Sequence, residues 1–255
     1  LGCPTWPRCT DDSLVNVPEQ GIHGIIEFAN RTLTGVLVII AGLAFIAAIR
    51  QPRQERHGLL APAIAVIAGI FVQAVVGGIS VWVKLNPWVV ATHFLLSAIL
   101  IAVASLLYWR SLQLTAFAIP LQAYQLSPWL SLSGAITVVV GVLVTGAGPH
   151  AGDPGTPRNG FDLEIIQHWH SYPAYLTLLL AALIWFNLRR VSSNGDLKAP
   201  LRIVTTLLAT LIVQAMVGIW QARTGVPAGL VAVHMLLASV LVSLLTLQQL
   251  AIRGK

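Results

Sequence analysis

Apolar residues gather in seven long runs that are separated by short polar segments. About 20 mostly apolar helical residues are enough to cross a hydrocarbon core of about 30 Å, and each run is that long. In chain order the runs cover residues 22 to 49, 59 to 83, 87 to 109, 128 to 147, 163 to 188, 201 to 222 and 228 to 251. The pattern predicts an all-α polytopic membrane protein with seven membrane-spanning helices.

Composition and charge support a membrane protein and orient it. Of the 255 residues 56% are hydrophobic and only 9% are charged, whereas about a quarter are charged in a soluble protein. Positively charged residues concentrate on the cytoplasmic side of membrane proteins. Ten of the 15 Lys and Arg lie on one side, namely Arg50, Arg53, Arg56, Arg110, Arg189, Arg190, Lys198, Arg202, Arg253 and Lys255. This side is predicted to be cytoplasmic and explains the net charge of +6 without a nucleic-acid partner.

An internal repeat organises the chain. FVQAVVG at 71 to 77 matches IVQAMVG at 212 to 218, and VVATHFLL at 89 to 96 matches LVAVHMLL at 230 to 237. Over residues 71 to 100 the copies agree at 11 of 30 positions, at an offset of 141. Each copy holds a Gln and a His that are 20 residues apart, which apolar composition alone does not explain.

The repeat extends to the first and fifth helices, where IIEFAN at 25 to 30 matches IIQHWH at 165 to 170. The fourth helix has no partner, so we expect an eighth helix upstream of Leu1 and two pseudo-symmetric four-helix bundles. Parallel repeats of this kind are a known membrane architecture. We expect four segments: an external loop (1 to 21), an N-terminal half (22 to 109), a cytoplasmic connector (110 to 127) and a C-terminal half (128 to 255).

Three histidines enter their helices from the predicted outer surface to a similar depth: His93, His170 and His234. Two histidines at one depth on neighbouring helices can supply both axial ligands of a haem iron. The alternative is a hydrogen bond between helices, but polar groups inside a membrane are costly and mark functional sites. The matched depth favours His170 and His234 as a haem pair.

Neighbouring polar residues leave alternatives open. His168 and His170 lie about 200° apart on one helix, so only one can face the bundle interior, and the repeat favours His170. We expect His168 to be interfacial or to support the site. Gln73 and Gln214 are either functional or simple interhelical hydrogen-bond donors.

Glu27 is the only carboxylate that lies clearly within an apolar run and beyond its first turn. It either forms an ion pair with Arg31, one helical turn away, or accepts protons and stabilises positive charge near a haem. Arg31 could instead bind a haem propionate.

Cys3 and Cys9 lie in the predicted external loop, where an oxidising environment favours a disulfide. Their spacing is neither CxxC nor CxxCH, which disfavours zinc and covalently attached haem. The disulfide would be a structural link or a redox group.

These motifs resemble the haem A synthases of bacteria and mitochondria. The resemblance rests on GCPTWPRC, IIEFANR, the segment from QAVVGG to ATH, TGAGPHAGD and AVHMLLAS, which occur in the family's order and span nearly the whole chain. It implies that a ring methyl of haem O is oxidised to the formyl group of haem A by successive hydroxylations with water. It also implies a haem b cofactor in the C-terminal half and substrate haem O in the N-terminal half.

Transferred to this sequence, the resemblance assigns the haem b iron to His170 and His234 and the substrate haem iron to His93. Glu27 becomes the catalytic carboxylate, and Cys3 and Cys9 become the external cysteine pair. Many family members carry a His where this chain has Asn30. Because Asn is a poor iron ligand, His93 is expected to bind the substrate haem alone.

The expected setting is a cell (inner) membrane, which the chain crosses several times, with the haem sites toward the extracytoplasmic side. Expected partners are a haem O synthase and cytochrome oxidase assembly factors. One alternative function is a two-haem cytochrome b that passes electrons to or from quinone, although that would require four ligands and no buried carboxylate. The other is a protein that delivers haem without altering it.

Overall fold

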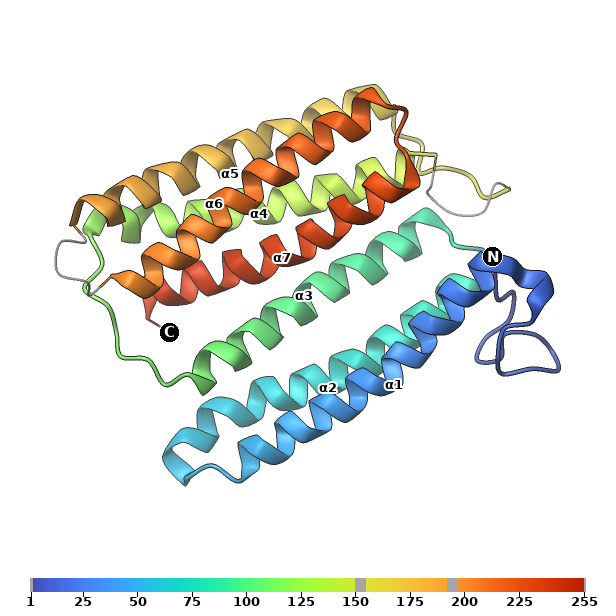
Figure 1. Cartoon of the computed structure of the whole chain (residues 1–255), viewed down its shortest axis with the longest axis horizontal. Helices are drawn as coiled ribbons and strands as arrows, with labels where there is room; N and C mark the ends of the chain where they lie inside the picture. The colour runs from blue at the N-terminus through green and yellow to red at the C-terminus, as the bar shows by residue number, and fades with distance from the viewer. Residues whose placement is uncertain (1, 150–154, 192–196, 255) are drawn as a thin grey trace. The chain divides into compact units, whose positions relative to one another are not determined.

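The computed structural model describes residues 2 to 149, 155 to 191 and 197 to 254, and these contain helices and no strand (Figure 1). A short 3-10 helix, η1 (Pro18–Gln20), leads into the first long helix. The long helices are α1 (Gly21–Ile49), α2 (Arg53–Trp82), α3 (Pro87–Ser111), α4 (Leu121–Ala147), α5 (Leu163–Val191), α6 (Lys198–Arg223) and α7 (Ala228–Arg253). Within the described residues all seven are long and apolar enough to cross a membrane, which confirms the all-α membrane class.

Two helices begin six or seven residues earlier than the apolar runs predict. α2 begins at Arg53 instead of residue 59, and α4 begins at Leu121, directly after Pro120, instead of at residue 128. A helix satisfies its own backbone hydrogen bonds, so it can continue through a polar turn beyond an apolar run. The predicted connector is therefore helical over residues 121 to 127, and Pro128 lies inside α4.

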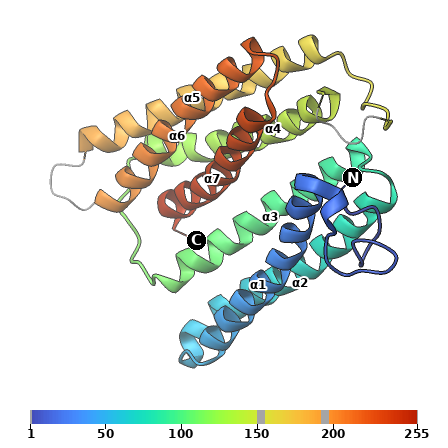
Figure 2. The ribbon, with the colours of Figure 1, turned by 45° about the vertical axis from the view of Figure 1, so that its right-hand side comes forward.

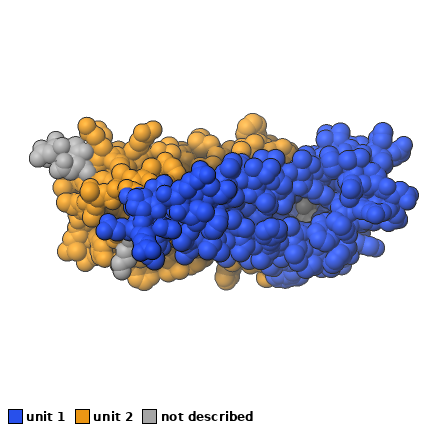
Figure 3. Space-filling model, turned by 90° about the horizontal axis from the view of Figure 1, so that it is seen from below, with its two compact units in different colours: residues 1–107, 145–160 blue, residues 108–144, 161–255 orange. Residues whose placement is uncertain are grey.

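The chain divides into two compact units, which Figure 3 colours separately. Unit 1 comprises residues 1 to 107 and 145 to 160, and unit 2 comprises residues 108 to 144 and 161 to 255. Unit 1 thus contains α1, α2 and most of α3, while unit 2 contains most of α4 and all of α5, α6 and α7.

In unit 2 the four helices α4 to α7 enclose an apolar core (Figure 2). Leu130, Ile184 and Leu207 are fully buried in it. Two buried hydroxyl groups join α4 to α5 inside this core, because Ser133 Oγ and Thr177 Oγ1 lie 2.9 Å apart. Hydrogen bonds of this kind fix the relative position of membrane helices.

The outward faces of the helices carry large apolar side chains. Ile39 is 65% exposed, Met216 57% and Leu236 66%, and they belong to three different helices. Exposed apolar surface on this scale is unusual for a soluble monomer. These faces therefore fit the hydrocarbon of a bilayer.

In unit 1 two loops pack at the end where α2 stops and α3 starts. The ring of Trp6 lies 5.6 Å from that of Trp82. Thr156 Oγ1 donates a hydrogen bond of 2.7 Å to the backbone carbonyl of Lys84. The TGAGPHAGD motif belongs to the second of these loops, but its residues 150 to 153 lie outside the described residues. The N-terminal loop, in contrast, is described from Gly2 onward.

Candidate functional site

The three predicted histidines all lie near the starts of their helices. His93 lies six residues after Pro87 of α3, His170 seven after Leu163 of α5 and His234 six after Ala228 of α7. At a rise of 1.5 Å per residue, each is about 9 to 10 Å into its helix. His170 and His234 share unit 2, and His93 belongs to unit 1.

His170 and His234 form a pair of neighbouring rings in an edge-to-face arrangement. Their ring centres are 6.4 Å apart, and the ring planes differ by 66°. Two metal–nitrogen bonds of about 2 Å in line would place the ring centres about 6 Å apart, which is close to the observed separation. Two histidines are also enough for a haem, because the porphyrin supplies the other iron ligands.

A metal site built from protein ligands alone is not favoured. The described residues contain no group of three or more His, Cys, Asp and Glu that could hold an ion. Structural and catalytic zinc sites need at least three such ligands. The two histidines alone are too few for such a zinc site.

The orientation of His170 is fixed by a residue that the sequence did not reveal. Its Nδ1 lies 3.0 Å from the backbone carbonyl oxygen of Thr137 on α4. A carbonyl oxygen only accepts, so Nδ1 must carry the proton and Nε2 keeps its lone pair. A metal-binding His commonly donates its other N–H to a carbonyl or carboxylate in this way. The arrangement prepares Nε2 as a ligand.

Each copy of the repeat forms the same contact between its Gln and its His. Gln214 Nε2 donates 3.0 Å to the backbone carbonyl of His234, and Gln73 Nε2 donates 3.1 Å to that of His93. Gln73 also reaches Ser97 Oγ at 2.6 Å. The two glutamines are therefore interhelical donors that position the helix turns carrying the histidines, which is one of the two roles left open by the sequence.

The same polar atoms lack a partner in both copies. Within the described residues the buried Nδ1 atoms of His93 and His234 have no hydrogen-bond partner, nor do the Oε1 atoms of Gln73 and Gln214. Buried polar atoms without a partner are rare in native proteins and often belong to functional sites. Each histidine thus lies in surroundings that a polar ligand could complete.

The two copies differ where the sequence differs. Asn30 is exposed on α1. His170, which the repeat aligns with it, is only partly exposed and contacts α4. Unit 2 therefore has a pair of histidines, whereas in unit 1 an exposed asparagine occupies the corresponding position.

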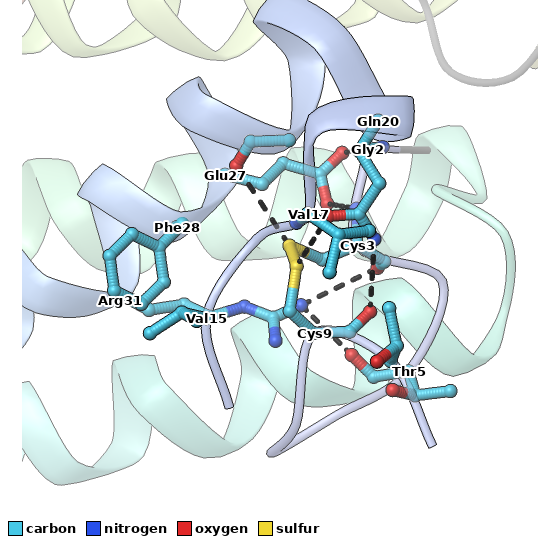
Figure 4. The surroundings of a disulfide bond; sticks show 12 residues. Gly2, Cys3, Thr5, Cys9, Val15, Val17, Gln20, Glu27, Phe28 and Arg31 are labelled. Carbon is cyan, nitrogen blue, oxygen red and sulfur yellow. Dashed lines mark hydrogen bonds between the residues drawn. A yellow bond between two sulfur atoms is a disulfide. The ribbon is translucent and has the colours of Figure 1, made fainter. Parts of the chain in front are cut away.

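Glu27 binds the backbone of the N-terminal loop (Figure 4). Its Oε1 accepts from the N–H of Gly2 at 2.7 Å, and its Oε2 accepts from the N–H of Cys3 at 2.8 Å. Each carboxylate oxygen has two lone pairs, so both retain capacity to accept a proton or a further hydrogen bond.

Arg31, one turn further along α1, binds the same loop from its other side. Its guanidinium group donates to four backbone carbonyls, those of Cys3, Thr5, Pro7 and Arg8, over 2.8 to 3.4 Å. The hydrogen bonds of Glu27 and Arg31 thus go to loop backbone, a role that neither the ion-pair nor the haem hypothesis included.

Cys3 and Cys9 close this loop. Both are fully buried, their Cα atoms lie 4.4 Å apart, and they are paired in the structure (Figure 4). The Cα separation lies at the short end of the usual range for a disulfide. The paired cysteines hold the stretch of backbone that Glu27 and Arg31 bind.

His168 is exposed and lies on the outside of α5. Its Nδ1 is 2.7 Å from the backbone carbonyl of Glu164 in the same helix. The side chain therefore does not join the pair formed by His170 and His234.

A comparison with protein families decides the family of the chain. The family model COX15-CtaA, described as cytochrome oxidase assembly protein, matches residues 1 to 246. The chain belongs to this family. Membership of this family gives the protein a role in the assembly of cytochrome oxidase. It also agrees with the resemblance to haem A synthases. Comparisons with curated proteins and with solved structures gave no significant match.

Proposed function

We propose that this protein is a haem A synthase, which oxidises a ring methyl of haem O to the formyl group of haem A. The observation that carries the proposal is the close pair His170 and His234, whose ring centres are 6.4 Å apart, in a family that assembles cytochrome oxidase. A candidate catalytic carboxylate, Glu27, lies in the other unit.

In the C-terminal half, residues 128 to 255, His170 and His234 would hold a haem b. When bound, this group supplies one-electron redox chemistry. The Thr137 carbonyl keeps the Nδ1 proton of His170 in place, and Gln214 anchors the backbone of His234. The residues of unit 2 would thus hold the ring of His170 and the backbone of His234 before a haem binds, which lowers the cost of ordering the site.

In the N-terminal half, residues 22 to 109, His93 would hold the substrate haem O. Each hydroxylation of the methyl carbon with water as oxygen source releases two protons and two electrons, and an external electron acceptor would take up the electrons. A second hydroxylation gives a geminal diol, which loses water to form the aldehyde. The site therefore needs a proton acceptor near the reacting methyl, and Glu27 offers two oxygens with free lone pairs.

The distribution of Lys and Arg supports a position in the cell membrane with the haem sites toward the extracytoplasmic side. The substrate is an amphipathic porphyrin that would enter from the membrane. A haem O synthase would then be the supplier of substrate, and the assembling oxidase would be the recipient of the product.

The direct test is the haem content of cells that make haem O but no haem A. Expression of this chain should add a haem A peak in chromatograms of extracted haems. The His170→Ala variant should lose the low-spin haem b spectrum of the purified protein and the haem A peak together.

Two other functions predict different chromatograms. A two-haem cytochrome that only passes electrons would keep its haem b spectrum while haem O remained unchanged. A protein that delivers haem would bind haem O and release it unaltered. Either result would refute the proposed synthase activity.

A further inference from the structure

Each of the three candidate ligand histidines lies against a glycine of a neighbouring helix. A Cβ built on Gly141 of α4 would come within 2.8 Å of His170 Cε1. A Cβ on Gly218 of α6 would lie 3.1 Å from His234 Cε1. A Cβ on Gly77 of α2 would lie 3.3 Å from His93 Cε1. The same ring atom is the nearest one in all three cases.

The position of this contact matters chemically. Cε1 lies between Nδ1 and Nε2, so a methyl group pressing on it moves the edge of the ring that carries the metal-binding nitrogen. Real Cβ atoms essentially never approach another atom within 3.0 Å, and 3.0 to 3.4 Å is tighter than nine in ten such contacts. The ring of His170 has little freedom to yield, because its Nδ1 is held by the Thr137 carbonyl.

Ordinary helix packing does not account for this placement of glycine. Glycine is a poor helix former, and small residues in membrane helices usually serve close backbone approach. Two other helical glycines in this chain lie against apolar side chains, since a Cβ on Gly134 would meet the side chain of Leu245 and one on Gly69 that of Leu100. In contrast, Gly77, Gly141 and Gly218 each face an imidazole.

We propose that Gly77, Gly141 and Gly218 are positioning residues that set the ring orientation of the three haem-binding histidines. This inference rests on the proposed function, because it assumes that His93, His170 and His234 bind haem. Gly77 and Gly218 occupy equivalent positions, four residues after Gln73 and Gln214. Each copy of the repeat therefore positions its histidine through two residues, a glutamine and a glycine. The glutamine holds the backbone of the histidine, and the glycine sets its ring.

We expect an alanine substitution to disturb haem binding more, the closer its Cβ would come to the histidine ring. Gly141→Ala should disturb the haem held by His170 most, because its Cβ would come closest and would also lie 3.2 Å from Nδ1. Gly218→Ala should disturb the same haem less. Gly77→Ala should raise the KM for haem O without shifting the spectrum of the haem in unit 2.

The experiment measures the ferric low-spin haem of the purified holoprotein by electron paramagnetic resonance, whose g-values respond to the orientation of the axial rings. Gly141→Ala and Gly218→Ala should shift the g-values or abolish the signal. Gly134→Ala is the matched control. Gly134 lies on the same helix as Gly141, and its added Cβ would come within 2.5 Å of the side chain of Leu245 instead of a histidine. This variant should lower the yield of folded protein and leave the g-values as in the parent.

The outcomes separate this inference from the proposed function. If His170→Ala and His234→Ala retain the low-spin signal, the haem assignment itself fails. If these variants lose the signal while Gly141→Ala and Gly218→Ala keep the parent g-values, only the positioning role is refuted. A shift in the Gly134→Ala control equal to that of Gly141→Ala would also refute it.

A second measurement covers the case in which Gly141→Ala does not fold. In a His170→Ala background the ring is gone, so adding Gly141→Ala should cost no further yield of folded protein. An equal loss of yield in both backgrounds would show that the alanine disturbs packing of the helices and not the histidine.

Discussion

The side-chain amide of Gln214 donates a hydrogen bond of 3.0 Å to the backbone carbonyl of His234 on the next helix. Gln73 and His93 form the same bond in the other unit at 3.1 Å. A backbone carbonyl inside a helix already accepts from the N–H four residues on, so this second bond is specific to the pair. The repeat in the sequence is thus a repeat of a three-dimensional contact.

We expect Gln214→Leu to lower the free energy of unfolding by at most about 1 kcal/mol, because interhelical bonds in membranes are worth about 0.6 kcal/mol on average. The substitution also removes the buried Oε1 atom of Gln214, which has no hydrogen-bond partner and is itself unfavourable, so part of the cost is offset. Gln73→Leu should cost more, because Gln73 also binds Ser97. Denaturant unfolding in detergent measures both, and the reverse order would contradict the structure.

The buried hydroxyl pair of unit 2 gives a second prediction. Thr177→Val keeps the shape of the side chain and removes its hydrogen bond to Ser133, so it should destabilise unit 2 by about 1 kcal/mol. A double-mutant cycle with Ser133→Ala should give a coupling energy of about 0.6 kcal/mol. Additive effects of the two substitutions would mean that the hydroxyl groups do not interact.

The two neighbouring histidines of α5 should behave differently. His168→Ala should leave the low-spin haem spectrum unchanged, because His168 is exposed and binds only the backbone of its own helix. His170→Ala should abolish that spectrum, because His170 faces His234. Absorption spectra of the two purified variants make the comparison. Loss of the signal in His168→Ala alone would reverse the assignment.

The state of the two cysteines can be measured directly. Protein purified without reductant should show no free thiol after denaturation, and two after reduction. Because the closed loop is short, replacing both cysteines by serine should cost about 2 kcal/mol of stability. It should also make the N-terminal loop more sensitive to limited proteolysis. Two free thiols before reduction would mean that Cys3 and Cys9 are not bonded in the protein.

The sequence predicted those features that show as a hydrophobic pattern or as an internal repeat along the chain. The apolar runs predicted all seven long helices of the described residues. The repeat in the sequence, which pairs Gln73 and His93 with Gln214 and His234, corresponds to the same hydrogen bond in both units. The sequence did not predict Thr137, because the atom that binds His170 is a backbone carbonyl, which every residue carries. It also missed the binding of the N-terminal loop by Glu27 and Arg31, since spacing along a helix says nothing about a loop that folds back onto it.

Glu27 binds the N-terminal loop in the structure, which gives a second explanation for any effect of changing this residue. Its carboxylate accepts two N–H groups of the N-terminal loop, so Glu27→Gln replaces one acceptor by an amide NH₂ that faces another donor. A purely structural Glu27 would therefore also lower activity when changed, by releasing the loop. Loss of haem A alone cannot separate the two roles.

Arg31→Gln supplies the matched comparison, because Arg31 binds four carbonyls of the same loop and carries no carboxylate. If Glu27 is catalytic, Glu27→Gln should keep haem bound at His170 and His234 while haem O or a hydroxylated intermediate accumulates. Arg31→Gln should make the N-terminal loop at least as sensitive to proteolysis as Glu27→Gln does, and it should still form haem A. Normal haem A yield from Glu27→Gln, or equal loss of haem A in both variants at equal loop release, would leave Glu27 as an anchor of the loop.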